Sequence, residues 1–137
     1  MFETLIQKLQ EDRYLTLETT PQHEPSMHNI IEKIKKFKID TKVDGFTCTD
    51  NPLAKLKYSS LFAALKLQQE FKKPVIATVA MRDRNKIALQ SDLLGANDFD
   101  IRAILALTGD PANMSDQPNT KGVYEANSLM LLKMIKS

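Results

Sequence analysis

Hydrophobic residues along the chain recur with two alternating spacings. In some segments they lie three and four positions apart, as on one face of a helix, and in others they run almost without interruption, as in a buried strand. The predicted helices cover residues 2–11, a segment that begins near Ser26, residues 59–71, residues 85–97 and a segment from about residue 124. The predicted strands cover residues 14–18, 43–48, 74–81 and 102–109.

Each predicted helix has an apolar stripe that we expect to face the core. These stripes consist of Phe2, Leu5, Ile6 and Leu9; Ile30, Ile31, Ile34 and Phe37; Leu61, Phe62, Leu65 and Leu67; Ile87, Leu89, Leu93 and Leu94; and Leu129, Leu132 and Met134. Ser26 is the predicted N-cap of the second helix, because a serine hydroxyl accepts hydrogen bonds from the free N–H groups of a first turn.

One helix followed by four strand–helix units predicts an α/β fold with a parallel sheet and right-handed crossovers. No Gly-x-Gly-x-x-Gly follows any predicted strand, so the dinucleotide-binding fingerprint of Rossmann folds is absent. The other common arrangement of repeated βα units is the TIM (β/α)8 barrel, of about 250 residues. We therefore predict that residues 1–137 form a single domain of parallel βα units, about half of such a barrel.

Composition limits which binding partners and which cellular compartment we expect. The net charge of +2 gives no electrostatic reason to expect nucleic acid or an anionic membrane as partner. The single cysteine, Cys48, cannot form an internal disulfide, and the N-terminal segment lacks the apolar run of a signal peptide. We predict a cytoplasmic protein in which Cys48 is a small buried apolar residue. His23 and His28 are expected at the surface, and no metal site is predicted.

Candidate chemistry follows from the ends of the strands, because barrel active sites lie at the carboxyl ends of parallel strands. This rule selects Glu18, Thr19, Thr47, Asp50, Met81, the segment 82–84, Thr108, Gly109 and Asp110. Two carboxylates, Glu18 and Asp110, are expected to face one mouth, where one can stay protonated as a general acid while the other stays ionised. The spacing leaves open that Glu18 only ends a strand and that Asp110 starts a turn. It also leaves open whether Arg82 and Arg84 bind phosphate or form ion pairs.

Five segments resemble the methylenetetrahydrofolate reductase family. They are MRDRNKIALQSDLLGA (81–96), ILALTGDP (104–111), LETTP (17–21), GFTCTDNP (45–52) and VYEANSLMLLK (123–133). The RDRN and LTGDP motifs together carry most of the resemblance, and the segments keep the order and spacing of the family. The resemblance implies that residues 1–137 are the N-terminal half of the family's barrel, about its first four strand–helix units.

The resemblance also implies an activity. Enzymes of this family bind FAD, which passes a hydride from NADH or NADPH to 5,10-methylenetetrahydrofolate and gives 5-methyltetrahydrofolate for methionine synthesis. Glu18 falls on the family's catalytic general acid and Asp110 on its aspartate beside flavin and pterin, so both are implied to contact the folate. The positions implied to contact the flavin are Thr47, Thr78, Leu107, Thr108, Gly109, Asp110 and Tyr124.

The chain departs from the family pattern at the third strand, where Thr78 replaces the usual histidine or glutamine and Met81 replaces a nearby cysteine. The remaining flavin contacts of the family and the glutamine that grips the pterin lie on later strands. A half barrel has unpaired edges, so we expect self-association or a complementary barrel half, and no activity of the chain alone. The alternatives are a non-catalytic half-barrel binding or assembly module and a phosphate-handling barrel that uses Arg82 and Arg84.

Overall fold

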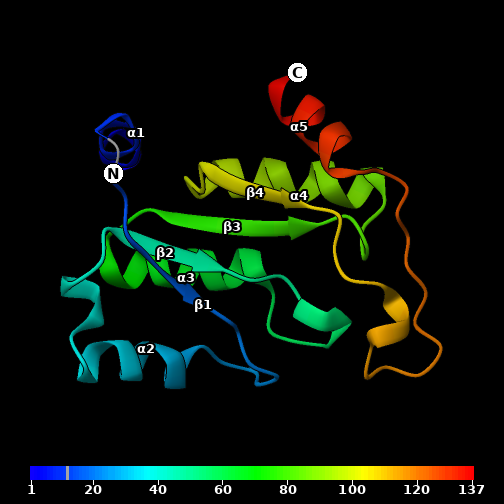
Figure 1. The fold of residues 1–137 in the computed structure, drawn as a ribbon, viewed down its shortest axis with the longest axis horizontal. Helices are drawn as coiled ribbons and strands as arrows, with labels where there is room; N and C mark the ends of the chain where they lie inside the picture. Colours follow the sequence, from blue (N-terminus) through cyan, green and yellow to red (C-terminus); the bar gives the residue numbers. More distant parts are fainter. Residues whose placement is uncertain (12) are drawn as a thin grey trace.

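Four parallel strands form one sheet in the order β1-β2-β3-β4, seen from the front in Figure 1. The computed structural model describes residues 1–11 and 13–137. The strands are β1 (Thr16–Thr19), β2 (Gly45–Cys48), β3 (Val75–Ala80) and β4 (Ala103–Leu107). Each strand pairs in parallel with the next one along the chain. This order confirms the predicted α/β fold with parallel strands, and each strand is shorter than predicted.

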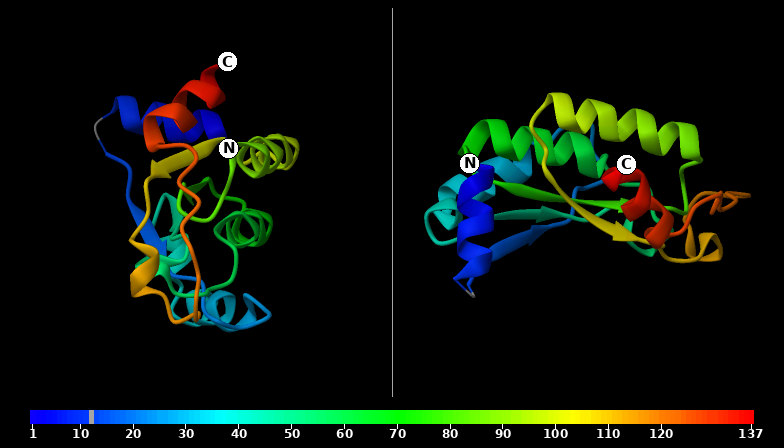
Figure 2. Two further views of the ribbon diagram at one scale, coloured as in Figure 1. Left: turned by 90° about the vertical axis from the view of Figure 1, so that its right-hand side faces the viewer. Right: turned by 90° about the horizontal axis from the view of Figure 1, so that it is seen from above.

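Five α-helices and three short 3-10 turns connect or flank the strands in the described part of the chain. The helices are α1 (Phe2–Gln10), α2 (His28–Lys36), α3 (Ser60–Phe71), α4 (Lys86–Asp98) and α5 (Ser128–Lys136). The 3-10 turns are η1 (Ile39–Thr41), η2 (Pro52–Ala54) and η3 (Ala112–Met114). Figure 2 shows that α2, α3 and α4 lie on one face of the sheet, so this face is covered by a helical layer.

Side-chain caps explain two of the helix starts. Asn127 Oδ1 accepts a hydrogen bond from Met130 N at 2.8 Å, so α5 begins four residues later than the predicted start near residue 124. Asn85 caps α4 in the same way through Ala88 N. The prediction of Ser26 as N-cap of α2 is wrong by one residue, since the N-cap position is Met27. The Ser26 hydroxyl nevertheless accepts a hydrogen bond from His28 N at 3.0 Å.

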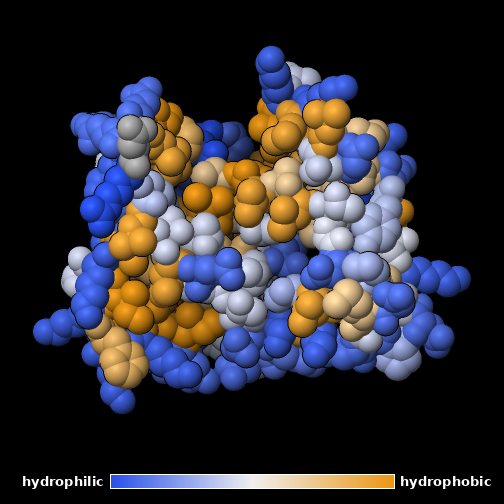
Figure 3. Space-filling view, viewed as in Figure 1, coloured by the Kyte–Doolittle hydropathy of each residue, from blue (hydrophilic) through white to orange (hydrophobic). Residues whose placement is uncertain are grey.

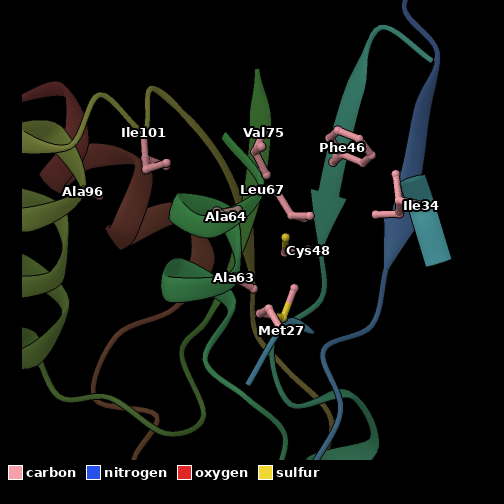
Figure 4. Close-up of a cluster of buried hydrophobic side chains, with 11 residues drawn as sticks. Met27, Ile34, Phe46, Cys48, Ala63, Ala64, Leu67, Val75, Ala96 and Ile101 are labelled. Carbon is pink, nitrogen blue, oxygen red and sulfur yellow. The ribbon is translucent and has the colours of Figure 1, made fainter. Parts of the chain in front are cut away.

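The main core lies between the sheet and the helical layer. Successive side chains of a strand point to opposite faces, so Phe46 and Cys48 of β2 point together toward α3 (Figure 4). There they meet Ala63, Ala64 and Leu67, and the small alanines let α3 approach the sheet closely. Cys48 is fully buried, as predicted, and burial raises the pKa of its thiol to about 11.

Several positions of the predicted apolar stripes face solvent instead. Phe62 of α3 is 64% exposed, because the α3 residues that face the sheet are Ala63, Ala64 and Leu67. In α5 the buried residue is Leu131, which was not in the predicted stripe. The other stripe positions found exposed are Ile6, Leu9, Phe37, Ile87, Leu94, Leu129 and Leu132. A helix with apolar residues on more than one face does not reveal its buried side by periodicity alone.

The opposite face of the sheet carries exposed apolar side chains. Leu105 and Leu107 of β4 are 47% and 44% exposed, and Figure 3 shows apolar surface over this face. Within residues 1–11 and 13–137, β1 and β4 each pair with one neighbour, so the sheet is open at both edges. The helices of this part of the chain include none that is long and apolar enough to cross a membrane.

Leu67→Ala tests the packing of α3 against the sheet. Leu67 is fully buried, so its truncation leaves a cavity and is expected to lower the free energy of unfolding by about 2–5 kcal/mol. Leu94→Ala is the matched control, because Leu94 is 75% exposed and its truncation is expected to cost below about 1 kcal/mol. Urea unfolding followed by circular dichroism measures both. Equal losses for the two variants would contradict this packing.

Candidate functional site

A cavity of about 360 Å³ lies at the carboxyl ends of the strands. Residues from the ends of β1, β3 and β4 and from the loops after β2, β3 and β4 line it. These residues are Glu18, Thr49, Asp50, Pro52, Thr78, Ala80, Arg82, Leu105, Leu107, Thr108, Gly109 and Asp110. The two carboxylates that sequence analysis selects, Glu18 and Asp110, therefore lie on the same cavity.

Glu18 has the more open position of the two carboxylates. Glu18 lies opposite Thr47 in the pairing of β1 with β2, and it is exposed to solvent. In the part of the chain that the structure describes, no hydrogen bond or ion pair engages its carboxylate. The carboxylate is therefore available to a bound molecule.

Asp110 is held from three sides. Its Oδ2 accepts a hydrogen bond from Leu53 N at 2.7 Å, and its backbone carbonyl accepts from Arg82 Nη1 at 3.2 Å and from the Tyr124 hydroxyl at 3.0 Å. These donors come from the loop after β2, the end of β3 and the segment before α5. Asp110 thus has a defined place at the junction of three loops.

Two arginines follow β3, the buried Arg82 and the partly buried Arg84, and both are ion-paired. Arg84 Nη1 lies 2.6 Å from Asp50 Oδ2, and Arg84 Nε lies 3.1 Å from Asp92. Asp50 Oδ2 also accepts a hydrogen bond from Ala80 N at 2.9 Å. Arg82 binds Asp83 through two hydrogen bonds, which hold the pKa of Asp83 below its usual value. The sequence left open whether Arg82 and Arg84 bind phosphate or form ion pairs, and in the structure both form ion pairs.

The predicted flavin contacts divide into two groups. Thr78, Leu107, Thr108, Gly109 and Asp110 line the cavity. Thr47 lies on β2 and is not among the lining residues, and Tyr124 lies in the segment before α5 with its hydroxyl on the Asp110 carbonyl. The structure therefore brings together the predicted contacts of β3 and β4 and leaves Thr47 and Tyr124 outside the lining.

A family comparison adds to this geometry. A sequence model described as methylenetetrahydrofolate reductase matches residues 3–137, which include both the strand-end carboxylates and the segments RDRN and LTGDP. The chain belongs to the methylenetetrahydrofolate reductase family. No curated protein matches the chain. The family match confirms the resemblance of the sequence segments, and membership suggests an oxidoreductase that acts on folate.

Thr49 and Leu105 line the cavity of this methylenetetrahydrofolate reductase family member, but sequence analysis did not select them. Thr49 directly follows β2, so the strand-end rule could have found it. Its hydroxyl oxygen is buried and has no hydrogen-bond partner within residues 1–11 and 13–137. Leu105 is a strand residue without polar atoms, and the sequence carries no signal for which face of β4 it occupies.

The methylenetetrahydrofolate reductase motif LTGDP requires its glycine for two physical reasons. Gly109 has a φ of +97°, a region that residues with a Cβ atom rarely adopt. A Cβ atom at this position would also lie 3.2 Å from the Cβ atoms of Ala80 and Arg82. The backbone at Gly109 consequently packs directly on the end of β3, and this close approach sets the position of the following Asp110.

Gly109→Ala tests this requirement. The backbone strain and the close contacts are expected to lower the free energy of unfolding by about 1–3 kcal/mol. Gly95→Ala is the matched control, because Gly95 lies in α4 with nothing within 4 Å of its would-be Cβ, and alanine there is expected to stabilise by about 0.5–1 kcal/mol. Thermal unfolding of the two variants should thus move in opposite directions. A neutral Gly109→Ala would refute the requirement.

Proposed function

We propose that the chain provides half of the active site of a flavin-dependent methylenetetrahydrofolate reductase. In this reaction NADH or NADPH reduces FAD, and the reduced FAD converts 5,10-methylenetetrahydrofolate to 5-methyltetrahydrofolate. The observation that carries the proposal is that Glu18 and Asp110 line one cavity in a chain of this family. The partner is a folate, and a cytoplasmic location agrees with a single cysteine that is reduced and buried.

The residues of the cavity fit a flavin. Thr49 has a buried hydroxyl without a partner in the described part of the chain, as expected where a polar ligand group completes the site. Leu105 and Leu107 supply apolar surface. The residues that would hold FAD are Thr78, Leu107, Thr108, Gly109 and Asp110, with Thr47 and Tyr124 as outer contacts. Bound FAD would supply hydride transfer between the nicotinamide and the folate.

Glu18 is the proposed general acid. Opening the five-membered ring of the folate requires a proton on the departing amine nitrogen, and a positioned carboxylic acid can deliver it. The open position of Glu18 at the end of β1 allows its carboxyl group to reach a bound substrate. It can also accept a proton from solvent after each turnover. Both carboxylates would thereby contact the folate, with distinct roles.

Asp110 is proposed as the fixed negative charge of the site. A negative charge at this place favours a cationic folate and disfavours additional negative charge on neighbouring groups. The hydrogen bond from Leu53 N holds the carboxylate in one orientation. Its charge would therefore act at a constant position during the reaction.

We propose that the four strand–helix units are the N-terminal half of a TIM barrel, with residues 1–137 as one domain. The support is the parallel order, the helical layer on one face and the exposed Leu105 and Leu107 on the other, which further strands of a barrel would cover. Self-association or a complementary barrel half would supply these strands. The same apolar face supports the second candidate, a non-catalytic half-barrel binding or assembly module.

Glu18→Gln tests the proposed acid in the protein expressed from its whole reading frame. Loss of the proton donor is expected to slow oxidation of reduced FAD by the folate by about 10²–10⁴-fold, while reduction of FAD by NADH or NADPH stays near wild type. Stopped-flow absorbance of the flavin separates the two half-reactions. Glu32→Gln, an exposed change on α2, is the matched control and should leave both rates unchanged.

Equal loss of both half-reactions in Glu18→Gln would exclude the general-acid role.

FAD titration of the wild-type protein distinguishes the two candidate functions. Saturable binding with folate-dependent oxidation of NADH or NADPH supports the reductase, and absence of FAD binding leaves the assembly module.

A further inference from the structure

Arg82 is a lining residue of the cavity whose side chain makes four hydrogen bonds. It lies two residues after the end of β3, and its side chain is only 2% exposed. Its Nε and Nη2 donate to the two oxygens of Asp83 at 2.8 and 2.7 Å. Its Nη2 also donates to the Asn51 carbonyl at 3.1 Å, and its Nη1 donates to the Asp110 carbonyl at 3.2 Å. One guanidinium group thus joins the ends of β2, β3 and β4.

The two carbonyls that Arg82 binds belong to the loops on either side of its own strand. Asn51 lies in the loop after β2, and Asp110 lies in the loop after β4. Asp83 neutralises the buried guanidinium, so the cost of burying the charge is offset locally. Since Asp83 already balances the charge, the other N–H groups of Arg82 can bind backbone carbonyls.

The loop after β2 has a backbone that needs such support. Asn51, Leu53 and Ala54 have φ values of 42°, 57° and 56°, which are unfavourable for residues with a side chain. Such conformations persist only where the surrounding contacts over-determine them. Arg82 supplies one contact at the Asn51 carbonyl, and the Asn51 side chain supplies another by accepting from Lys57 N at 2.8 Å.

The strained loop in turn presents a donor to the cavity. Leu53 N donates to Asp110 Oδ2 at 2.7 Å, so the conformation of this loop determines the orientation of the Asp110 carboxylate. Arg82 therefore acts on Asp110 twice, through its backbone carbonyl directly and through its carboxylate by way of residues 51–53.

We propose that Arg82 is the positioning residue for Asp110, fixing the orientation of this carboxylate toward the bound flavin and folate. The proposal rests on the function proposed above for the cavity. Arg82 does not react itself. Arginine is needed because its planar group offers five donors in a fixed geometry, whereas lysine offers three donors on one atom and cannot span Asp83 and both carbonyls.

The first test uses the flavin-free protein, so it does not depend on activity. In Arg82→Lys the amide hydrogen of Leu53 is expected to exchange with solvent at least about 10-fold faster, measured by NMR, because its acceptor is no longer held. The matched control is Arg84→Lys. Arg84 is ion-paired with Asp50 and Asp92 and has no contact with Asn51 or Asp110 in the described residues. This variant should lower stability and leave exchange at Leu53 unchanged.

The second test is a double-mutant cycle in the FAD-loaded protein from the whole reading frame. Arg82→Lys and Asp110→Asn are each expected to slow folate reduction by about 10–100-fold, and both should shift the midpoint potential of FAD in the same direction. The double variant should be no slower than Asp110→Asn alone, because Arg82 acts through Asp110. A residue with a purely structural role would instead give losses that multiply.

Unchanged exchange at Leu53 in Arg82→Lys, or multiplied losses in the cycle, would overturn the proposal. If Arg82→Lys does not fold, Arg82→Gln takes its place, since its amide retains a planar donor pair. Unfolding of both variants while Arg84→Lys stays folded would assign Arg82 to the fold and also overturn the proposal. A wild-type protein that does not bind FAD would refute the proposed function, whereas the exchange test at Leu53 would still decide the role of Arg82.

Discussion

Parallel pairing of the four strands is the constraint on which the site depends. Because each strand runs in the same direction as its neighbour, all loops that follow the strands lie at the carboxyl-terminal end of the sheet. Residues as distant in sequence as Leu53 and Asp110 thereby come within hydrogen-bond distance. An antiparallel neighbour would place the following loop at the opposite edge and separate the two carboxylates. The direction of the strands thus determines which loops can contribute side chains to the cavity.

The helical layer makes this pairing possible. A parallel sheet needs a crossover between successive strands, and here α3 returns the chain across the face that Phe46 and Cys48 cover. Alanines at the contact keep the helix close to the strands, and Ser60 donates to the Thr78 carbonyl at 2.7 Å at the start of α3. Packing and strand order therefore support one another on the covered face. The other face keeps its apolar residues exposed and is open to further chain.

The class of the fold was predictable from sequence because apolar runs and helical stripes alternate strictly along the chain. Strand limits and the buried sides of helices were less predictable. The apolar runs at 74–81 and 102–109 extend beyond the hydrogen-bonded ladder, so hydrophobicity alone overestimates the strands. Phe62 and Leu131 show that the orientation of a helix depends on how it fits against its neighbours. In α3 the face with Ala63, Ala64 and Leu67 packs on the sheet, and Phe62 faces solvent.

The candidate site divides in the same way. Glu18 and Asp110 were selected by their place at strand ends, and the structure places both on one cavity. The role of Arg82 was not predictable, because the contacts that give it this role are with two backbone carbonyls of other loops. Every residue has a backbone carbonyl, so the sequence does not show which carbonyls a side chain binds. The link from Leu53 N to Asp110 was hidden for the same reason. Residue type identifies groups that can react, while their orientation is set by contacts that only the fold creates.

The buried thiol of Cys48 has a practical consequence for work on this protein. Burial raises the pKa of this thiol to about 11, so little of it is ionised at pH 7, and only the ionised form reacts readily with alkylating reagents. Cys48 also lies between the sheet and α3, out of reach of solvent. Its modification would require α3 to separate from the sheet. The rate at which this sulfur atom is labelled therefore reports how often the core opens.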